Sequence, residues 1–130
     1  MAKPGHSGFR RILFAARCSA QGFAQAWSHE SAFRQEVALT VMLAPAAIWL
    51  GRNGTESVLL IGCCLLVLIV ELLNSAVEAA VDRIGDEHNH LSRRAKDMGS
   101  AAVFLSLALT VLVWATVLWE RFGQAAVGAP

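Results

Sequence analysis

Three carboxylates lie on one stripe of an apolar segment, where they could act on a phosphate group or hold a metal ion. They are Glu71, Glu78 and Asp82, and Asn74 and Ser75 share their side. On a helix these five side chains project within about 100° of one another, while the opposite side is apolar. A carboxylate inside hydrocarbon is costly, so it marks function unless it only joins helices. Three acids on one stripe exceed what packing needs, which favours function.

The order of the acids along the stripe indicates different roles. Glu71 lies about 10 Å deeper than Glu78, where a lipid hydroxyl would rest while its acyl chains stay in the bilayer. A carboxylate removed from water is a stronger base than an exposed one. Glu78 and Asp82 lie near the membrane surface, and Mg²⁺ prefers one or two carboxylates together with phosphate oxygens. One acid as base and others as metal ligands would suit phosphoryl transfer from Mg-ATP to an alcohol.

Two further clusters fall in the same layer. Glu30 is followed closely by the segment 33–36, and Lys96, Asp97 and Ser100 open the last apolar stretch. Lys96 offers a cation to a phosphate. The sequence contains neither a Walker loop nor the Gly-rich loop of protein kinases. The residues by themselves therefore indicate an acidic site at a membrane interface with cations nearby.

Four helical segments must position these residues. The first, residues 9–28, has apolar side chains on a stripe of roughly 100° to 120° and Arg and Gln opposite, as in a basic amphipathic helix of the membrane interface. Three apolar stretches follow, at about 32–50, 57–84 and 96–120. Each is about as long as, or longer than, the roughly 20 residues that cross a bilayer.

Composition agrees with membrane helices, since the chain is 55% hydrophobic and only 16% charged. We therefore expect an all-α membrane protein with one interfacial and three transmembrane helices. It forms a single domain over residues 1–130, with a tail at 124–130. The net charge of +1 gives no electrostatic argument for nucleic-acid binding.

The distribution of Lys and Arg predicts the orientation, because cations favour the cytoplasmic side. With the N-terminus inside, only Arg52 and Arg121 lie outside. The cytoplasmic cations are then Lys3, Arg10, Arg11, Arg17, Arg34, Arg83, Arg93, Arg94 and Lys96. The preference of cations for the cytoplasmic side is enough to explain why Arg93 and Arg94 occur in this segment, without a role in phosphate binding.

Three motifs, in order, closely resemble the prokaryotic diacylglycerol kinase family. They occupy residues 30–36, 71–85 and 94–102, and the similarity runs from about Gly8 to Gly123. The related undecaprenol kinases are similar in the second motif. Around residues 33–36 and 97–100, this chain follows the diacylglycerol kinase form instead.

The resemblance implies a homotrimer in the bacterial cytoplasmic (inner) membrane, with the C-terminus periplasmic, that phosphorylates diacylglycerol with ATP at the cytoplasmic face. It implies Glu71 as general base on the lipid hydroxyl, and Glu30 and Glu78 as ligands of the Mg²⁺ of Mg-ATP. Cys18 stands where a tyrosine near the adenine is usual. Matching gives the nucleotide-contacting positions as Arg11, Cys18, Glu30, Glu78, Glu87, His88, Asn89, Lys96 and Asp97. It gives the lipid-contacting positions as Arg11, Trp27, Ala32, Phe33, Arg34, Gln35, Glu36, Glu71 and Ser100. Asn74 and Asp82 resemble supports of the site.

Three other functions share some of these features. The first is the same chemistry on a polyprenol, as in undecaprenol kinase. The second is a small proton-coupled transporter, which needs one deep carboxylate but no interfacial cluster such as Glu30, Glu78 and Lys96. The third is a non-catalytic membrane adaptor, which would not need Glu71.

Overall fold

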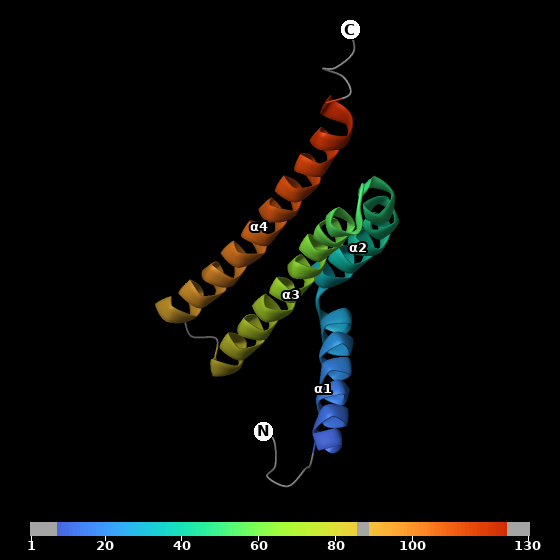
Figure 1. The fold of residues 1–130 in the computed structure, drawn as a ribbon. Helices are drawn as coiled ribbons and strands as arrows, with labels where there is room; N and C mark the ends of the chain where they lie inside the picture. The colour runs from blue at the N-terminus through green and yellow to red at the C-terminus, as the bar shows by residue number, and fades with distance from the viewer. Residues whose placement is uncertain (1–7, 86–88, 125–130) are drawn as a thin grey trace.

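The computed structural model describes residues 8–85 and 89–124, and within these ranges the regular structure is entirely helical. The helices are α1 (Gly8–His29), α2 (Ser31–Leu50), α3 (Gly54–Ile84) and α4 (His90–Leu118), and a π-helical turn, η1 (Trp119–Gly123), extends α4. Figure 1 shows α3 between α2 and α4, while α1 leaves this group at the start of α2. The all-α prediction is confirmed for the described residues.

A single residue, Glu30, separates α1 from α2. Its backbone is extended, with φ −107° and ψ 108°, yet helix-like hydrogen bonds continue on both sides of it. The amide of Glu30 donates to the Ala26 carbonyl at 2.9 Å, and the amide of Arg34 donates to the Glu30 carbonyl at 3.3 Å. The chain therefore changes direction at Glu30 and places this carboxylate at the corner between the two helices.

Local capping sets the beginnings and the end of the two long helices. The Asn53 side chain accepts from the Glu56 amide at the start of α3, and the Asn89 side chain accepts from the Leu91 amide at the start of α4. Consequently α3 begins at Gly54 and α4 at His90, before the starts at 57 and 96 that hydropathy indicated. Gly85 follows α3 with φ 135°, a conformation that glycine adopts readily.

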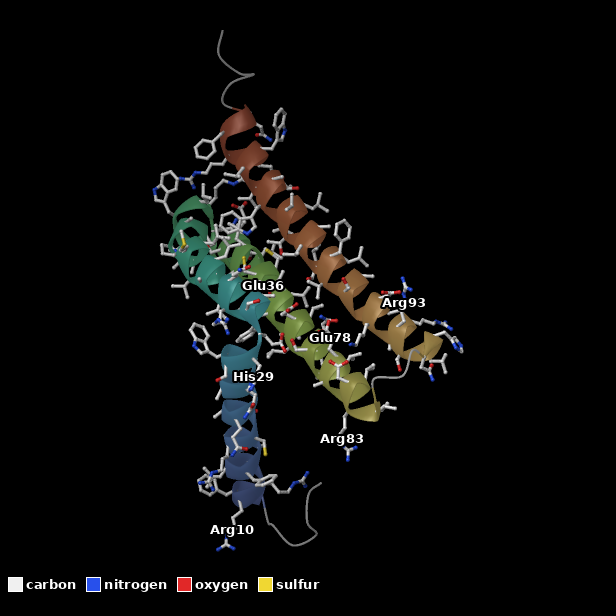
Figure 2. The ribbon with its side chains drawn as sticks, turned by 180° about the vertical axis from the view of Figure 1, so that it is seen from behind. Arg10, His29, Glu36, Glu78, Arg83 and Arg93 are labelled. Carbon is white, nitrogen blue, oxygen red and sulfur yellow. The ribbon has the colours of Figure 1, made fainter. Side chains whose placement is uncertain are left out.

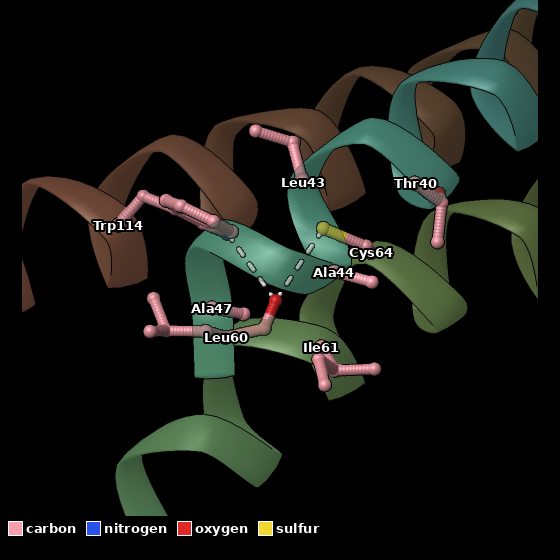
Figure 3. Close-up of a pocket in the computed structure, with 8 residues that line it drawn as sticks. All are labelled: Thr40, Leu43, Ala44, Ala47, Leu60, Ile61, Cys64 and Trp114. Atoms are coloured by element: carbon pink, nitrogen blue, oxygen red, sulfur yellow. Dashed lines mark hydrogen bonds between the residues drawn. The ribbon is translucent and has the colours of Figure 1, made fainter. Parts of the chain in front are cut away.

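The main apolar core joins α2, α3 and α4 at the end of the molecule away from Glu30. It consists of Ala47, Leu50, Leu60 and Val117. Three side chains donate to one carbonyl here, that of Leu60. They are the Cys63 thiol at 3.1 Å, and the Trp114 indole at 3.2 Å and the Cys64 thiol at 3.4 Å, both drawn in Figure 3. This end also carries ion pairs of Arg52 with Glu56 and with Glu120, whereas Glu30 and the polar stripe of α3 lie towards the opposite end.

Among the described residues, two helices are long and apolar enough to cross a membrane, namely α3 and the helix from His90 to Gly123. Their most apolar 18-residue windows have mean hydropathies of 2.5 and 2.4, yet only 28% and 11% of those residues are buried by the chain. Apolar surface of this extent needs lipid or further protein to cover it. The chain is therefore built as a membrane protein, while the crossing by α2 and the homotrimer stay predictions.

Candidate active site

The polar stripe of α3 runs from a buried to an exposed end. Glu71 is only 6% exposed. Asn74, Ser75 and Glu78 are partly buried, and Asp82 is exposed. The stripe thus leads from the interior of the helix group towards Ile84, where α3 ends, in the order that helical spacing gives.

Carboxylates from α2, from α3 and from the α1–α2 corner lie around Glu71. Glu30 at that corner and Glu78, about two turns further along α3, both lie close enough to repel its charge. Glu36 from α2 also interacts electrostatically with Glu71. Figure 2 shows Glu36 near the start of α2 and Glu78 on the neighbouring stretch of α3. Such a concentration of negative charge favours a cation, a proton or both at this site.

An amide and an amine complete the polar cluster. The Asn74 Nδ2 donates to Glu78 Oε1 at 3.1 Å, which orients that carboxylate. The Lys96 Nζ donates to Asp82 Oδ1, and its charge also interacts with Glu78. Lys96 therefore brings a positive charge from α4 beside the acidic stripe, as a phosphate site requires.

A cleft of about 390 Å³ opens between α1 and α3, next to these carboxylates. Its lining includes Glu30 and Ser75 together with residues that sequence reasoning did not single out: Gly22, Gln25, Ala26, His29, Leu72, Ala76 and Ala79. The spacing of Gly22 and Ala26 on one helix face could have indicated it, because small residues leave room between helices. The His29 ring Nδ1 lies 3.0 Å from the Gln25 carbonyl, so this contact fixes the imidazole on α1.

Several predicted lipid-contacting residues lie close to Glu30, where α1 meets α2. Arg34 donates from Nη1 to the Trp27 carbonyl at 2.8 Å and so ties α2 to the end of α1. Trp27, Ala32 and Gln35 are exposed, whereas Phe33 is only 4% exposed and contributes to packing. The buried Glu36 Oε2 has no hydrogen-bond partner among the described residues, which leaves it able to accept from a bound hydroxyl.

The fold brings only some of the predicted nucleotide-contacting residues close to the carboxylates. Arg11 and Cys18 are exposed on α1, and Arg10, the neighbour of Arg11, lies at the far end of that helix from Glu36 in Figure 2. Asn89 caps α4. The exposed Asp97 lies 3.9 Å from Arg93, and Ser100 is exposed. The predicted contacts Glu87 and His88 lie outside the described residues.

The carboxylates near Glu71 suit a metal ion that takes few ligands from the protein and the rest from phosphate and water. Residues 8–85 and 89–124 contain no group of three or more His, Cys, Asp and Glu side chains able to hold a metal ion. Glu30 and Glu78 supply two carboxylates, the number that Mg²⁺ takes from proteins when phosphate oxygens and water complete its coordination. The residues therefore fit Mg²⁺ that arrives with a nucleotide.

A buried acid flanked by further carboxylates and a lysine, at one end of membrane-type helices, is an arrangement suited to phosphoryl transfer at a lipid surface. Comparison with known proteins agrees. Residues 17–118 match the sequence model described as "Prokaryotic diacylglycerol kinase". The chain therefore belongs to the prokaryotic diacylglycerol kinase family, and its enzymatic class is lipid kinase.

Similar proteins cover nearly the whole chain. The diacylglycerol kinase of Escherichia coli (strain K12) is 50% identical over 117 residues, which are 90% of this chain and 96% of that protein. The diacylglycerol kinase of Pseudomonas aeruginosa is 52% identical over 114 residues, 88% of this chain and 93% of that protein. The protein of the same name from Haemophilus influenzae is 44% identical over 113 residues, 87% of this chain and 96% of its own length.

Proposed function

We propose that the protein transfers the γ-phosphate of ATP to the free hydroxyl of diacylglycerol at the cytoplasmic face of a bacterial inner membrane. The observation that carries this proposal is the burial of Glu71 among Glu30, Glu36 and Glu78. The cleft between α1 and α3 has an apolar wall of Leu72, Ala76 and Ala79 on its α3 side. A lipid can thus approach from the side while its headgroup reaches the carboxylates.

In this mechanism Glu71 accepts the hydroxyl proton of the lipid. The hydroxyl oxygen forms a bond to the γ-phosphorus, the bond from that phosphorus to the β–γ bridging oxygen breaks, and ADP leaves with the electron pair. Burial suits Glu71 to this role because desolvation makes a carboxylate a stronger base. Glu36 would lie beside the lipid headgroup, and its negative charge next to Glu71 would favour transfer of the hydroxyl proton to Glu71.

Glu30 and Glu78 would hold the Mg²⁺ of Mg-ATP, which when bound neutralises charge on the phosphates. Asn74 keeps Glu78 in position through its 3.1 Å hydrogen bond. Lys96, held by Asp82, would contact the phosphates of the nucleotide. Arg11, Cys18, Glu87, His88, Asn89 and Asp97 stay proposed nucleotide contacts.

The proposed assembly is a homotrimer with the N-terminus cytoplasmic and the C-terminus periplasmic. Arg83 and Arg93 lie at the end of the helices that carries the carboxylates (Figure 2), whereas Arg52 belongs to the α2–α3 turn at the opposite end. Further copies would cover the apolar faces of α3 and α4 and shield the acidic stripe from lipid.

The decisive experiment measures phosphorylation by the purified protein in mixed micelles that contain a diacylglycerol or undecaprenol, with Mg-ATP. We expect phosphatidic acid from diacylglycerol and a much lower rate with undecaprenol. Preference for undecaprenol would assign the polyprenol reaction instead, and no ATP-dependent product with either lipid would overturn the proposal. A Glu71→Gln enzyme should lose the activity in this assay. Its matched control is Glu56→Gln, the same substitution at the other end of α3, which should keep the activity.

A further inference from the structure

The contact between Gly99 of α4 and Asn74 of α3 bears on how the carboxylates are positioned. We infer that Gly99 is a positioning residue: its lack of a side chain lets α4 approach closely enough to hold the Asn74 amide in the orientation that presents Glu78 to Mg-ATP. The inference rests on the proposed function, because it assigns Glu78 to the nucleotide.

The negative charge of Glu78 fixes the orientation of the Asn74 amide. Its Nδ2 donates to Glu78 Oε1 at 3.1 Å. The reverse orientation would place the amide oxygen against a carboxylate oxygen, and two acceptors repel each other. The amide oxygen must therefore point towards α4, where it is buried and has no hydrogen-bond partner among the described residues.

Gly99 of α4 restricts the position of the same amide from the side of its oxygen. A Cβ placed on Gly99 would overlap the Asn74 Oδ1, and it would lie 3.3 Å from Cγ and 3.8 Å from Cβ of the same residue. The backbone of α4 at Gly99 thus lies directly against the amide, and any side chain there must displace it. A buried oxygen without a hydrogen-bond donor is costly, so it stays in this position only because the surrounding helices hold it there.

The packing of α4 on α3 prevents an easy escape. The two helices contact each other, and the α4 side chains of Thr110 and Trp114 donate to the Cys63 and Leu60 carbonyls of α3, each at 3.2 Å. Since these contacts hold the two helices together, an added methyl group at residue 99 displaces the Asn74 amide before it separates the helices. Glu78 then loses its donor, and the carboxylate moves within the metal site.

The test compares Gly99→Ala with Gly62→Ala, which introduces the same methyl group on α3 where nothing lies within 4 Å of it. We expect Gly99→Ala to raise the KM for Mg-ATP by about 10- to 100-fold, as misplacement of a binding group does, with a smaller change in the KM for diacylglycerol. Gly62→Ala should resemble the wild type. A Gly99→Ala enzyme with a wild-type KM for Mg-ATP would overturn the inference.

A double-variant cycle shows whether the effect passes through Asn74. In an Asn74→Ala background the methyl group has room, so Gly99→Ala should add less than twofold to the loss already caused by Asn74→Ala. Multiplicative effects would overturn the inference. If Gly99→Ala alone fails to fold, Asn74→Ala/Gly99→Ala must restore folding in detergent, and failure to do so would also overturn it. Inactivity of the wild type with Mg-ATP and diacylglycerol would instead refute the proposed function.

Discussion

The Lys96 Nζ lies 2.5 Å from the Asp82 Oδ1, so an ion pair joins the second turn of α4 to the last turns of α3. Both side chains are well exposed, at 41% and 65%. Exposed pairs contribute little to stability because water screens them and their side chains lose entropy. The pair is better suited to hold the lysine beside the carboxylates than to hold the fold together.

Substitution of Asp82 by Asn should therefore affect nucleotide binding more than stability. Without its partner Lys96 is free to move, and we expect the KM for Mg-ATP to rise by about threefold to tenfold, as for a modest misplacement. The free energy of unfolding should change by less than about 1 kcal/mol. Steady-state kinetics and thermal unfolding in detergent measure the two effects. Glu120→Gln, which alters an exposed pair at the other end of the molecule, is the control, and equal effects on KM from both variants would contradict the prediction.

Glu71→Gln should nearly abolish the chemical step. The amide keeps the shape of the side chain but cannot take the hydroxyl proton, and general base catalysis is typically worth about 10²- to 10⁴-fold in kcat. Binding of Mg-ATP should survive, because Glu71 lies roughly 10 Å from Glu78 along the helix. A near-normal kcat, measured with saturating lipid and nucleotide, would show that another group is the base.

Glu78→Gln should weaken the response to Mg²⁺ instead. A neutral amide is a poor ligand for a hard cation, so the Mg²⁺ titration should shift to higher concentrations and nucleotide binding should weaken. Measuring Mg²⁺ dependence and Mg-ATP binding for this variant and for Glu71→Gln separates the two roles. Loss of Mg-ATP binding in Glu71→Gln but not in Glu78→Gln would reverse the assignment.

The proposed orientation can be tested by cysteine labelling in a version without native cysteines. Asn53 caps the start of α3, and Asn89, which follows the other end of α3, caps the start of α4. A cysteine at residue 53 should react with an impermeant maleimide in intact spheroplasts, while one at residue 89 should react only after lysis. The opposite pattern would place the carboxylates on the periplasmic side.

Crosslinking in detergent should reveal a closed oligomer with three subunits. The chain buries only a small part of the apolar surface of α3 and α4, and the helices of a single chain cannot also shield an acidic stripe from lipid. An amine- or carboxylate-directed reagent should therefore give bands up to the trimer. Fully active protein that yields only monomer would exclude this assembly.

Arg121 should matter for stability but not for catalysis. It donates to the Leu50 carbonyl at 2.6 Å and lies 4.9 Å from the ring centroid of Trp49. Arg121→Ala should cost about 1–2 kcal/mol in the free energy of unfolding, with Arg121→Lys in between because it keeps only the charge. The activity per folded molecule should stay unchanged, since the carboxylates lie at the other end of α3. A fall in kcat would contradict this independence.

The sequence by itself determined the helices and the stripe of Glu71, Asn74, Glu78 and Asp82. Apolar runs and the helical repeat are local properties, because residues three and four apart share a face in any helix. The starts of α3 and α4 at Gly54 and His90 were also readable in principle, since their asparagine caps act within three residues. Hydropathy missed these starts because capped first turns are polar.

Only the tertiary structure decided which residues meet across helices. The chain changes direction at Glu30 without a proline or glycine that would predict it from the sequence. This change of direction brings Glu30 and Glu36 to Glu71 and opens the cleft beside α1. The approach of Gly99 to Asn74 and of Lys96 to Asp82 depends on how α4 packs on α3. Helix packing is set by many distant side chains together, so no local signal in the sequence could have given these contacts.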